Sequence, residues 1–171
     1  MAVGFKNGTD GDIGIAIDAL TAANAPHSYI GVLRNGHTGI FRTRGNPYCH
    51  LVLRGGKEKS NFDASSIVRT KEKLSKAHAR TKILIDCSHG NSGKDPRRQH
   101  LAFEEALRQR LYGEKAIFGM MLESFLKPGK QTLHENQTPD PEISVTDGCI
   151  SFEETEKLIL RARSELGKRT K

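Results

Sequence analysis

Short apolar runs alternate along the chain with longer segments in which apolar residues recur every three or four positions. The runs predict β-strands at 2–5, 50–53, 82–86, 116–121 and 142–146. The intervening segments predict helices at about 12–23, at 64–77, from 95 to 113, and from Ser151 towards the C-terminus. Strands that alternate with helices are typical of parallel βαβ units, so we expect an α/β fold.

Capping residues and apolar stripes support the predicted helices. Asp63 is placed to cap the second helix, Asp95 precedes a proline at the start of the third, and Ser151 with Glu154 forms a capping box for the last. The first and last helices each carry one apolar stripe: Ile13, Ala16, Ile17 and Leu20 in the first, Leu158, Ala162 and Leu166 in the last. We expect these stripes to be buried.

The stretch "HSYIGVLRNGHTGIFRT" departs from the alternation, because two β-prone runs flank an Asn-Gly pair. Asn-Gly tolerates the positive φ angles of a tight turn and predicts a hairpin. A parallel sheet does not need one, so we expect an insertion at about 27–45 that lies outside the main sheet. No linker or low-complexity segment divides the chain, which predicts a single domain over 1–171.

A residue able to bind an anion or a metal follows each predicted strand. In chain order these residues are Lys6, Arg54, His89, Glu123 and Asp147. The carboxyl ends of parallel strands meet at one edge, and in barrels of βα units that edge carries the active site. We therefore expect the five side chains to converge.

The five residues form two chemical sets. Lys6 and Arg54 are cations suited to phosphate or carboxylate recognition, and the glycines after Arg54 allow close approach of the backbone to a ligand. His89, Glu123 and Asp147 offer an imidazole and two carboxylates, a set that suits Mn²⁺, Fe²⁺, Co²⁺ or Zn²⁺ better than Ca²⁺. Taken singly, each could be a structural or solvated side chain; their coincidence at five strand ends favours a site.

A second interpretation concerns Cys87 and His89. Residues two apart on a strand face the same side, so the pair could meet as a nucleophile and its base. The other strand ends offer cations and acids rather than an oxyanion hole, which disfavours this chemistry.

Composition narrows the function classes. The chain has 171 residues, a net charge of +7 and three cysteines, with no C-x-x-C pair for zinc or redox chemistry. No apolar run approaches the length of a membrane span, and the N-terminus resembles neither a signal nor a transit peptide. We expect a cytoplasmic protein with reduced thiols. The basic excess lies largely on predicted helices beside acids, so we expect no nucleic-acid partner.

Five motifs, in order, resemble the C-terminal half of the class I microbial 3-deoxy-D-arabino-heptulosonate 7-phosphate (DAHP) synthases. They are "GFKNGTDG", "LRGGK", "IDCSHGNSGK", "GEKAIFGMMLES" and "TDGCI". The resemblance spans essentially the whole chain. It implies the last five βα units of a TIM (β/α)8 barrel, and a metal-dependent condensation of phosphoenolpyruvate with erythrose 4-phosphate that releases phosphate and opens the shikimate pathway.

Roles for the five residues follow from the resemblance. Lys6, Arg54 and His89 are expected to act catalytically and to contact phosphoenolpyruvate. Asp147 is also expected at the substrates. His89, Glu123 and Asp147 are expected to bind the divalent metal.

The chain also departs from the family pattern. Roughly the first half of the family's chain has no counterpart, including a metal-binding cysteine and a Lys-Pro-Arg-Thr stretch that contacts the substrates. Neither Cys87 nor Cys149 can be assigned that cysteine's role. We expect an incomplete barrel whose unpaired edges favour association with an N-terminal half or with further copies of the chain. Alone, the chain is expected to be inactive or nearly so.

Three alternatives stay open at this point. The first is a related phosphoenolpyruvate-condensing aldolase, such as an octulosonate-phosphate synthase. The second is a catalytically silent binding or interaction module derived from the enzyme. The third is a basic nucleic-acid-binding protein, which predicts strongly salt-dependent affinity.

Overall fold

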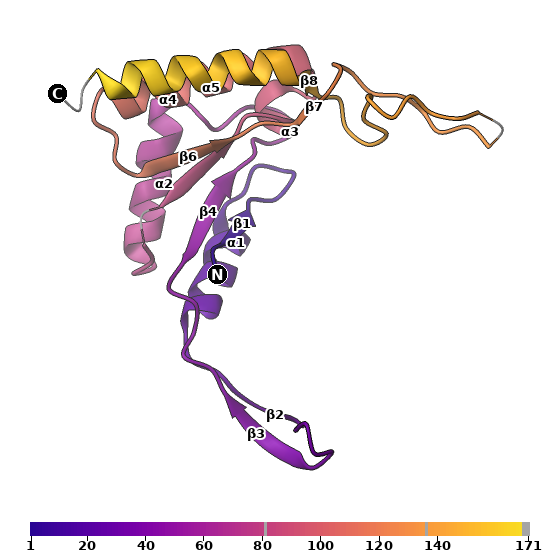
Figure 1. Ribbon diagram of the computed structural model, residues 1–171. Helices are drawn as coiled ribbons and strands as arrows, with labels where there is room; N and C mark the ends of the chain where they lie inside the picture. Colours follow the sequence, from indigo (N-terminus) through magenta and orange to yellow (C-terminus); the bar gives the residue numbers. More distant parts are fainter. Residues whose placement is uncertain (81, 136, 169–171) are drawn as a thin grey trace.

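A four-stranded parallel sheet forms the centre of the computed structural model, which describes residues 1–80, 82–135 and 137–168 (Figure 1). Its strands lie in the order β1-β4-β5-β6. Their bounds are Val3–Lys6, Cys49–Leu53, Ile83–Asp86 and Ile117–Met121. The α/β class with parallel pairing is therefore confirmed.

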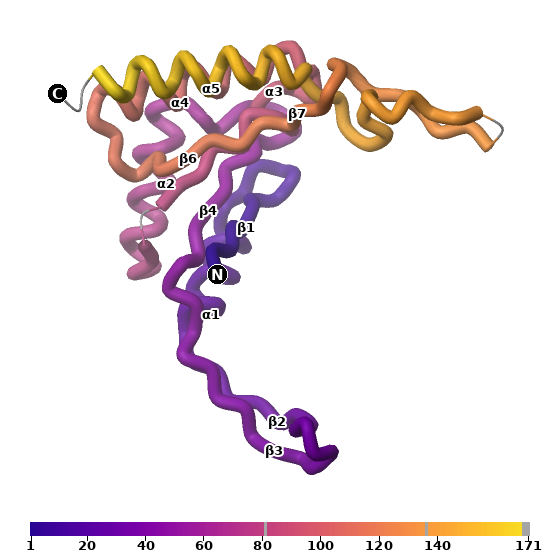
Figure 2. The backbone as a smooth tube through the Cα atoms, in the orientation of Figure 1, coloured from indigo at the N-terminus to yellow at the C-terminus, as the bar shows by residue number. Residues whose placement is uncertain are grey.

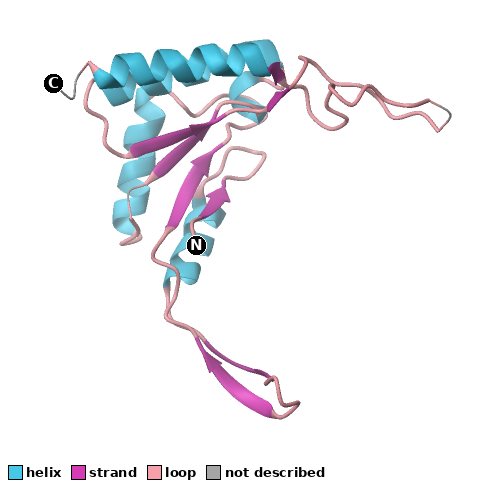
Figure 3. Cartoon of the chain, in the orientation of Figure 1, coloured by secondary structure: helices cyan, strands magenta, loops and turns pink. Residues whose placement is uncertain are grey.

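Helices pack on the sheet and enclose the core (Figure 3). The longer ones are α1 (Gly14–Asn24), α2 (Ala64–Lys76), α4 (Gln99–Leu111) and α5 (Phe152–Gly167). Alternate residues of β4 explain the packing, because Cys49, Leu51 and Leu53 join this core whereas His50 and Val52 face the other way. No helix in the described part of the chain has the length and apolarity needed to cross a membrane.

Strand register brings the carboxyl ends of the strands to one edge. Lys6 pairs with Val52, Val52 with Leu84, and Asp86 with Met121. Residues one to three positions beyond these pairs therefore emerge together, including Arg54, His89 and Glu123. The expected convergence thus has a direct basis in the sheet.

The predicted hairpin is confirmed as a separate two-stranded antiparallel sheet. It consists of β2 (Ser28–Val32) and β3 (Thr38–Arg42), and it extends away from the main sheet (Figure 2). Tyr29 and Phe41 stack across it with ring centroids 5.5 Å apart. This contact lies remote from the edge that carries the strand-end residues.

The prediction of a fifth strand at 142–146 is wrong. This segment runs as a loop whose backbone is held by the opposite arm of the same long loop: Lys127 N–H donates to Glu142 O and Gln131 N–H to Ser144 O. Beyond β6 the chain instead forms a separate two-stranded parallel sheet from β7 (Ser124–Phe125) and β8 (Ile150–Ser151). Within the described residues the main sheet therefore has four strands, where the sequence predicted five.

Most predicted caps are confirmed. The Asp63 carboxylate accepts from Ser66 N–H, and the Ser151 hydroxyl accepts from Glu154 N–H. Asp95 caps a 3-10 turn, Pro96–Arg98, that leads into α4. In α5 the predicted stripe holds for Leu158 and Ala162, whereas Leu166 is 39% exposed near the end of the helix.

Candidate metal and anion site

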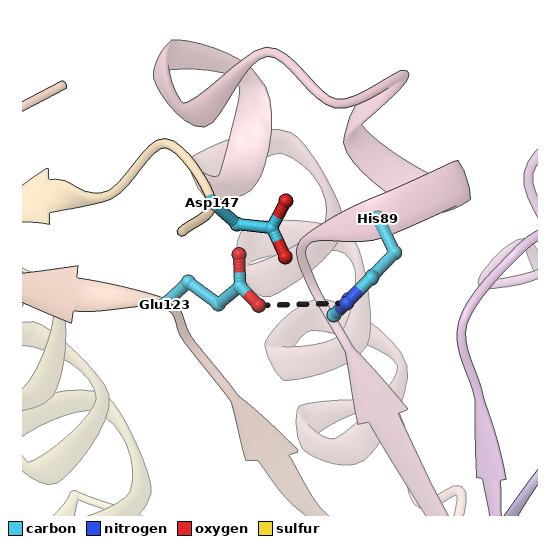
Figure 4. Close-up of side chains that lie close together, drawn as sticks. All are labelled: His89, Glu123 and Asp147. Atoms are coloured by element: carbon cyan, nitrogen blue, oxygen red, sulfur yellow. Dashed lines mark ion pairs between the residues drawn. The ribbon is translucent and has the colours of Figure 1, made fainter. Parts of the chain in front are cut away.

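Three side chains converge at the carboxyl edge of the sheet: His89, Glu123 and Asp147 (Figure 4). Each offers one ligand atom, and these atoms all lie within 4.8 Å of one another. His89 Nε2 lies 3.5 Å from Glu123 Oε1. We call these residues the metal trio. They come from three separate chain segments, as the sequence predicted.

Glu123 is held through its backbone and its side chain. The buried side chain of Gln99 accepts from Glu123 N–H at 2.8 Å and donates to Glu123 O at 3.0 Å. Ile150 N–H donates to the same carbonyl, and the Ser88 hydroxyl donates to Glu123 Oε2 at 2.8 Å. Oε1 is thereby left to face His89.

His89 begins the short helix α3 (His89–Ser92) in a left-handed conformation, with φ of 51°. Non-glycine residues rarely adopt this conformation, and such strain clusters at functional sites. Nδ1 lies 2.9 Å from Asp86 Oδ2, although it makes no hydrogen bond to any described group. Nε2 faces Glu123. A carboxylate behind a metal-binding imidazole is a common way to fix the orientation of the ring.

The donor set fits a divalent transition ion. Bonds to imidazole nitrogen or carboxylate oxygen measure about 2.0–2.2 Å, so one ion spans two ligand atoms up to roughly 4.4 Å apart. The observed limit of 4.8 Å therefore requires only a small closure. An ion would also relieve the repulsion between the Glu123 and Asp147 carboxylates. One nitrogen and two oxygens are typical of Mn²⁺, Fe²⁺, Co²⁺ or Zn²⁺ sites.

The two predicted cations lie at the same edge of the sheet. Lys6 Nζ donates to Asp86 Oδ2 at 2.8 Å, so one fully buried carboxylate contacts both Lys6 and His89. Arg54 directly follows β4, and its guanidinium makes no hydrogen bond or ion pair with any described residue. The structure thus joins Lys6 to the metal trio through Asp86, whereas Arg54 follows the neighbouring strand β4 and contacts the His89 turn through its backbone, where Asn91 N–H donates to Arg54 O at 3.1 Å.

A cavity of about 600 Å³ opens onto the trio. All three trio residues line it, and so do Lys94 and Lys130. Arg97 also lines the cavity, but its guanidinium is paired with Asp95 at 2.9 Å. The space is large enough for a small phosphorylated metabolite.

The cysteines do not support nucleophilic chemistry. Cys87 lies in the core beneath the sheet, and burial raises the pKa of its thiol to about 12. Its Sγ lies 3.8 Å from Ile85 O, and no contact in the described part of the chain joins it to His89, so the structure argues against the Cys-His interpretation. Cys149 lines the cavity, but its Sγ lies 3.6 Å from the carbonyl of Asp147, to which it donates, and burial raises its pKa too.

Two positioning residues were not predicted from the sequence: Asp86 and Gln99. Asp86 ends an apolar run, and a fully buried acid needs a cationic or hydrogen-bonding partner, so its position carried a usable signal. Gln99 gave no such signal. It lies among polar residues at the start of α4, and only the packing of that helix beside β6 reveals its contacts with Glu123.

Comparison with known proteins gives a consistent result. Residues 1–160 match the DAHP synthetase I family. The chain is 45% identical over 157 residues to the Phe-sensitive phospho-2-dehydro-3-deoxyheptonate aldolase of Escherichia coli K12, covering 92% of this chain and 45% of the relative. It is 42% identical over 170 residues to the Tyr-sensitive enzyme of Enterobacter agglomerans, covering 97% of this chain and 78% of that relative.

A solved structure agrees with the sequence relatives. The phospho-2-dehydro-3-deoxyheptonate aldolase of Francisella tularensis SCHU S4 superposes with a TM-score of 0.85 at 40% identity, covering 96% of this chain and 48% of that one. The chain thus spans about half the length of most of the relatives named here. By its sequence, its fold and the match over residues 1–160, this protein belongs to the DAHP synthetase I family.

Proposed function

We propose that this chain carries the metal site and part of the phosphoenolpyruvate site of a DAHP synthase. The observation that carries the proposal is the metal trio, assembled from three segments in a member of this family at the sheet edge where Lys6 and Arg54 also follow their strands. The reaction joins phosphoenolpyruvate to erythrose 4-phosphate and releases inorganic phosphate.

The cations suit the first substrate. Lys6 and Arg54 would bind the phosphate and carboxylate of phosphoenolpyruvate and offset the repulsion between two phosphorylated reactants. Asp86 would hold Lys6 in place while keeping the His89 ring oriented. His89 and Asp147 would lie against the substrates from the other side.

The metal trio suits the second substrate. A divalent ion held by His89, Glu123 and Asp147 supplies Lewis acidity toward an aldehyde oxygen. The methylene carbon of phosphoenolpyruvate would form the new carbon–carbon bond to the aldehyde carbon with the electron pair of its own double bond, while the electron pair of the aldehyde C=O bond would move to oxygen and take up a proton. Water then adds at the neighbouring carbon, and cleavage of the bond to the phosphate group releases inorganic phosphate.

The sheet is consistent with the C-terminal part of an eight-stranded (β/α) barrel. All four strands are parallel, the core lies between the sheet and its helices, and the similar solved chain is about twice as long. On the face opposite this core, His50 meets Phe118 edge to face, and Phe118 is 48% exposed. We propose that a further polypeptide segment, or another copy of the chain, covers this face and the β1 edge.

Binding and turnover test the proposal in two steps. First, Mn²⁺ and phosphoenolpyruvate are titrated into the chain and into His89→Ala; we expect the parent to bind both and the variant to lose Mn²⁺. Second, phosphate release is measured with erythrose 4-phosphate, for the chain alone and mixed with the N-terminal half of a relative. We expect release only in the mixture. A parent chain that binds neither ligand would instead identify a silent module.

A further inference from the structure

Three asparagines join the loops that leave β1, β4 and β5. Asn7 follows β1, Asn61 lies in the loop between β4 and α2, and Asn91 lies in α3 after β5. Asn7 is 2% exposed and Asn91 is 5% exposed. Buried amides need partners for both their donor and their acceptor atoms, so the contacts of this asparagine network describe how the three loops fit together.

The network holds the backbone of Arg54 and Gly55. Arg54 N–H donates to Asn7 Oδ1 at 2.8 Å, and Gly55 N–H donates to Asn61 Oδ1 at 2.8 Å. Asn91 N–H donates to Arg54 O at 3.1 Å, and Asn7 Nδ2 donates to Gly55 O at 3.0 Å. The asparagines therefore bond all four backbone N–H and C=O groups of these two residues, while the Arg54 guanidinium is bonded to no described residue.

The same asparagines contact one another and the strand ends. Asn61 N–H donates to Asn91 Oδ1 at 2.9 Å, and Asn61 Nδ2 donates to Asn7 Oδ1 at 3.2 Å. Asn91 Nδ2 donates to Leu53 O and to Asp86 O, at 3.0 and 2.8 Å. A continuous path of hydrogen bonds thus runs from the Arg54 loop to the residue whose side chain contacts both Lys6 and His89.

We propose that Asn61, acting with Asn7 and Asn91, is a positioning residue that fixes the Arg54 loop relative to the His89 turn. This inference rests on the proposed function, because it assigns the fixed geometry to phosphoenolpyruvate held by Arg54 against the metal trio. A loop held in place before the ligand arrives loses less conformational entropy on binding. Asn61 is the diagnostic member, since among the described residues its hydrogen bonds reach the Arg54 loop, Asn7 and Asn91 but no trio residue.

The contact pattern predicts different effects for two substitutions. Asn61→Ala frees Gly55 N–H and leaves Gln99, Ser88 and Asp86 in place around the trio, so it should weaken phosphoenolpyruvate binding with little effect on Mn²⁺. Asn91→Ala removes the bond to Asp86 O beside His89, so it should weaken both. Asn35→Ala is the matched control: Asn35 caps His37 N–H in the remote hairpin turn.

The test measures two affinities and one structural signal in the full chain. Mn²⁺ affinity is measured by electron paramagnetic resonance of the free ion, and phosphoenolpyruvate affinity by calorimetry at saturating Mn²⁺. Amide hydrogen exchange at Gly55 reports the loop itself. For Asn61→Ala we expect about tenfold weaker phosphoenolpyruvate binding, as for one lost hydrogen bond. We also expect Mn²⁺ affinity within about twofold of the parent and faster exchange at Gly55.

Each outcome supports or overturns the inference. If Asn61→Ala melts at a lower temperature but binds phosphoenolpyruvate as the parent does, the network is structural and the inference is wrong. If Asn61→Ala loses affinity for Mn²⁺ and phosphoenolpyruvate equally, the inference is also wrong, because the substitution would then disturb the whole site rather than the Arg54 loop. A parent chain that binds neither ligand refutes the proposed function, and the inference with it.

Discussion

Replacing Gly55 with alanine probes the contact between the Arg54 loop and the His89 turn. Gly55 has φ of +74°, a conformation that costs a residue with a Cβ roughly 1–2 kcal/mol. A Cβ atom there would also lie 2.5 Å from Asn91 N and 2.5 Å from Gly90 C. Both are backbone atoms and cannot rotate away, so the two loops must separate.

The loss of unfolding free energy is the sum of the cost of the positive φ angle and the cost of the steric clash. Overpacking a closely packed region costs about 1–3 kcal/mol, so Gly55→Ala should lower the free energy of unfolding by roughly 2–5 kcal/mol. Gly113→Ala is the matched control. Gly113 has φ of +102°, and a Cβ there would meet no atom within 4 Å, so only the backbone cost applies. The difference between the variants, about 1–3 kcal/mol, isolates the steric contact.

Urea unfolding followed by far-ultraviolet circular dichroism measures both variants, because the chain has no tryptophan for fluorescence. We expect a lower midpoint for Gly55→Ala than for Gly113→Ala, with similar slopes. Weaker phosphoenolpyruvate binding by Gly55→Ala should accompany the loss. Equal losses of free energy in the two variants would refute the packing of the Arg54 loop on the His89 turn.

Three further predictions concern the surroundings of the site and the core. Gln99→Ala removes both side-chain bonds to the backbone of Glu123, so Mn²⁺ affinity should fall by about tenfold or more in a titration; an unchanged affinity would exclude Gln99 as a positioning residue. Although burial opposes it, hydrogen bonds from Ser65 and Ser66 lower the pKa of Asp63 from 3.8 to about 2. The stability from this cap is therefore present above pH 3.8 and lost as the pH falls towards 2, so urea midpoints should drop less over this range in Asp63→Asn than in the parent. Because burial raises the pKa of Cys87 to about 12, native chain at pH about 8 should resist alkylation there, as read by peptide mass spectrometry, and unfolded chain should react; rapid native labelling would contradict the core position.

The sequence carried enough information to predict the sheet and most of the site. Apolar runs identified all four strands of the main sheet, and Asn35-Gly36 identified the hairpin. His89 and Glu123 were predictable because each lies two or three positions after a strand, and parallel strands bring their carboxyl ends together. Asp147 lies beside His89 and Glu123 although the strand predicted before it does not form, so strand ends do not explain its position; it shortly precedes β8, where Ile150 N–H donates to Glu123 O.

Contacts between distant side chains could not be predicted in the same way. The segment 142–146 has the apolar alternation of a strand, yet the side chain of Gln131 bonds to Asp140 and Ile143 and holds it as a loop. Likewise the asparagine network depends on three loops meeting at bonding distance. Asparagine is common in loops because it bonds local backbone, so its presence there did not indicate a long-range role.

The central claim is that His89, Glu123 and Asp147 bind one divalent ion at the carboxyl edge of the sheet. Electron spin echo measurements on Mn²⁺ bound to the chain test it most directly, because they detect nitrogen coupled to the ion. We predict coupling to a single imidazole nitrogen in the parent chain and in His100→Ala, whose ring contacts Arg97 O instead, and no signal from bound Mn²⁺ in His89→Ala. Bound Mn²⁺ without nitrogen coupling, or coupling that survives in His89→Ala, would contradict the account.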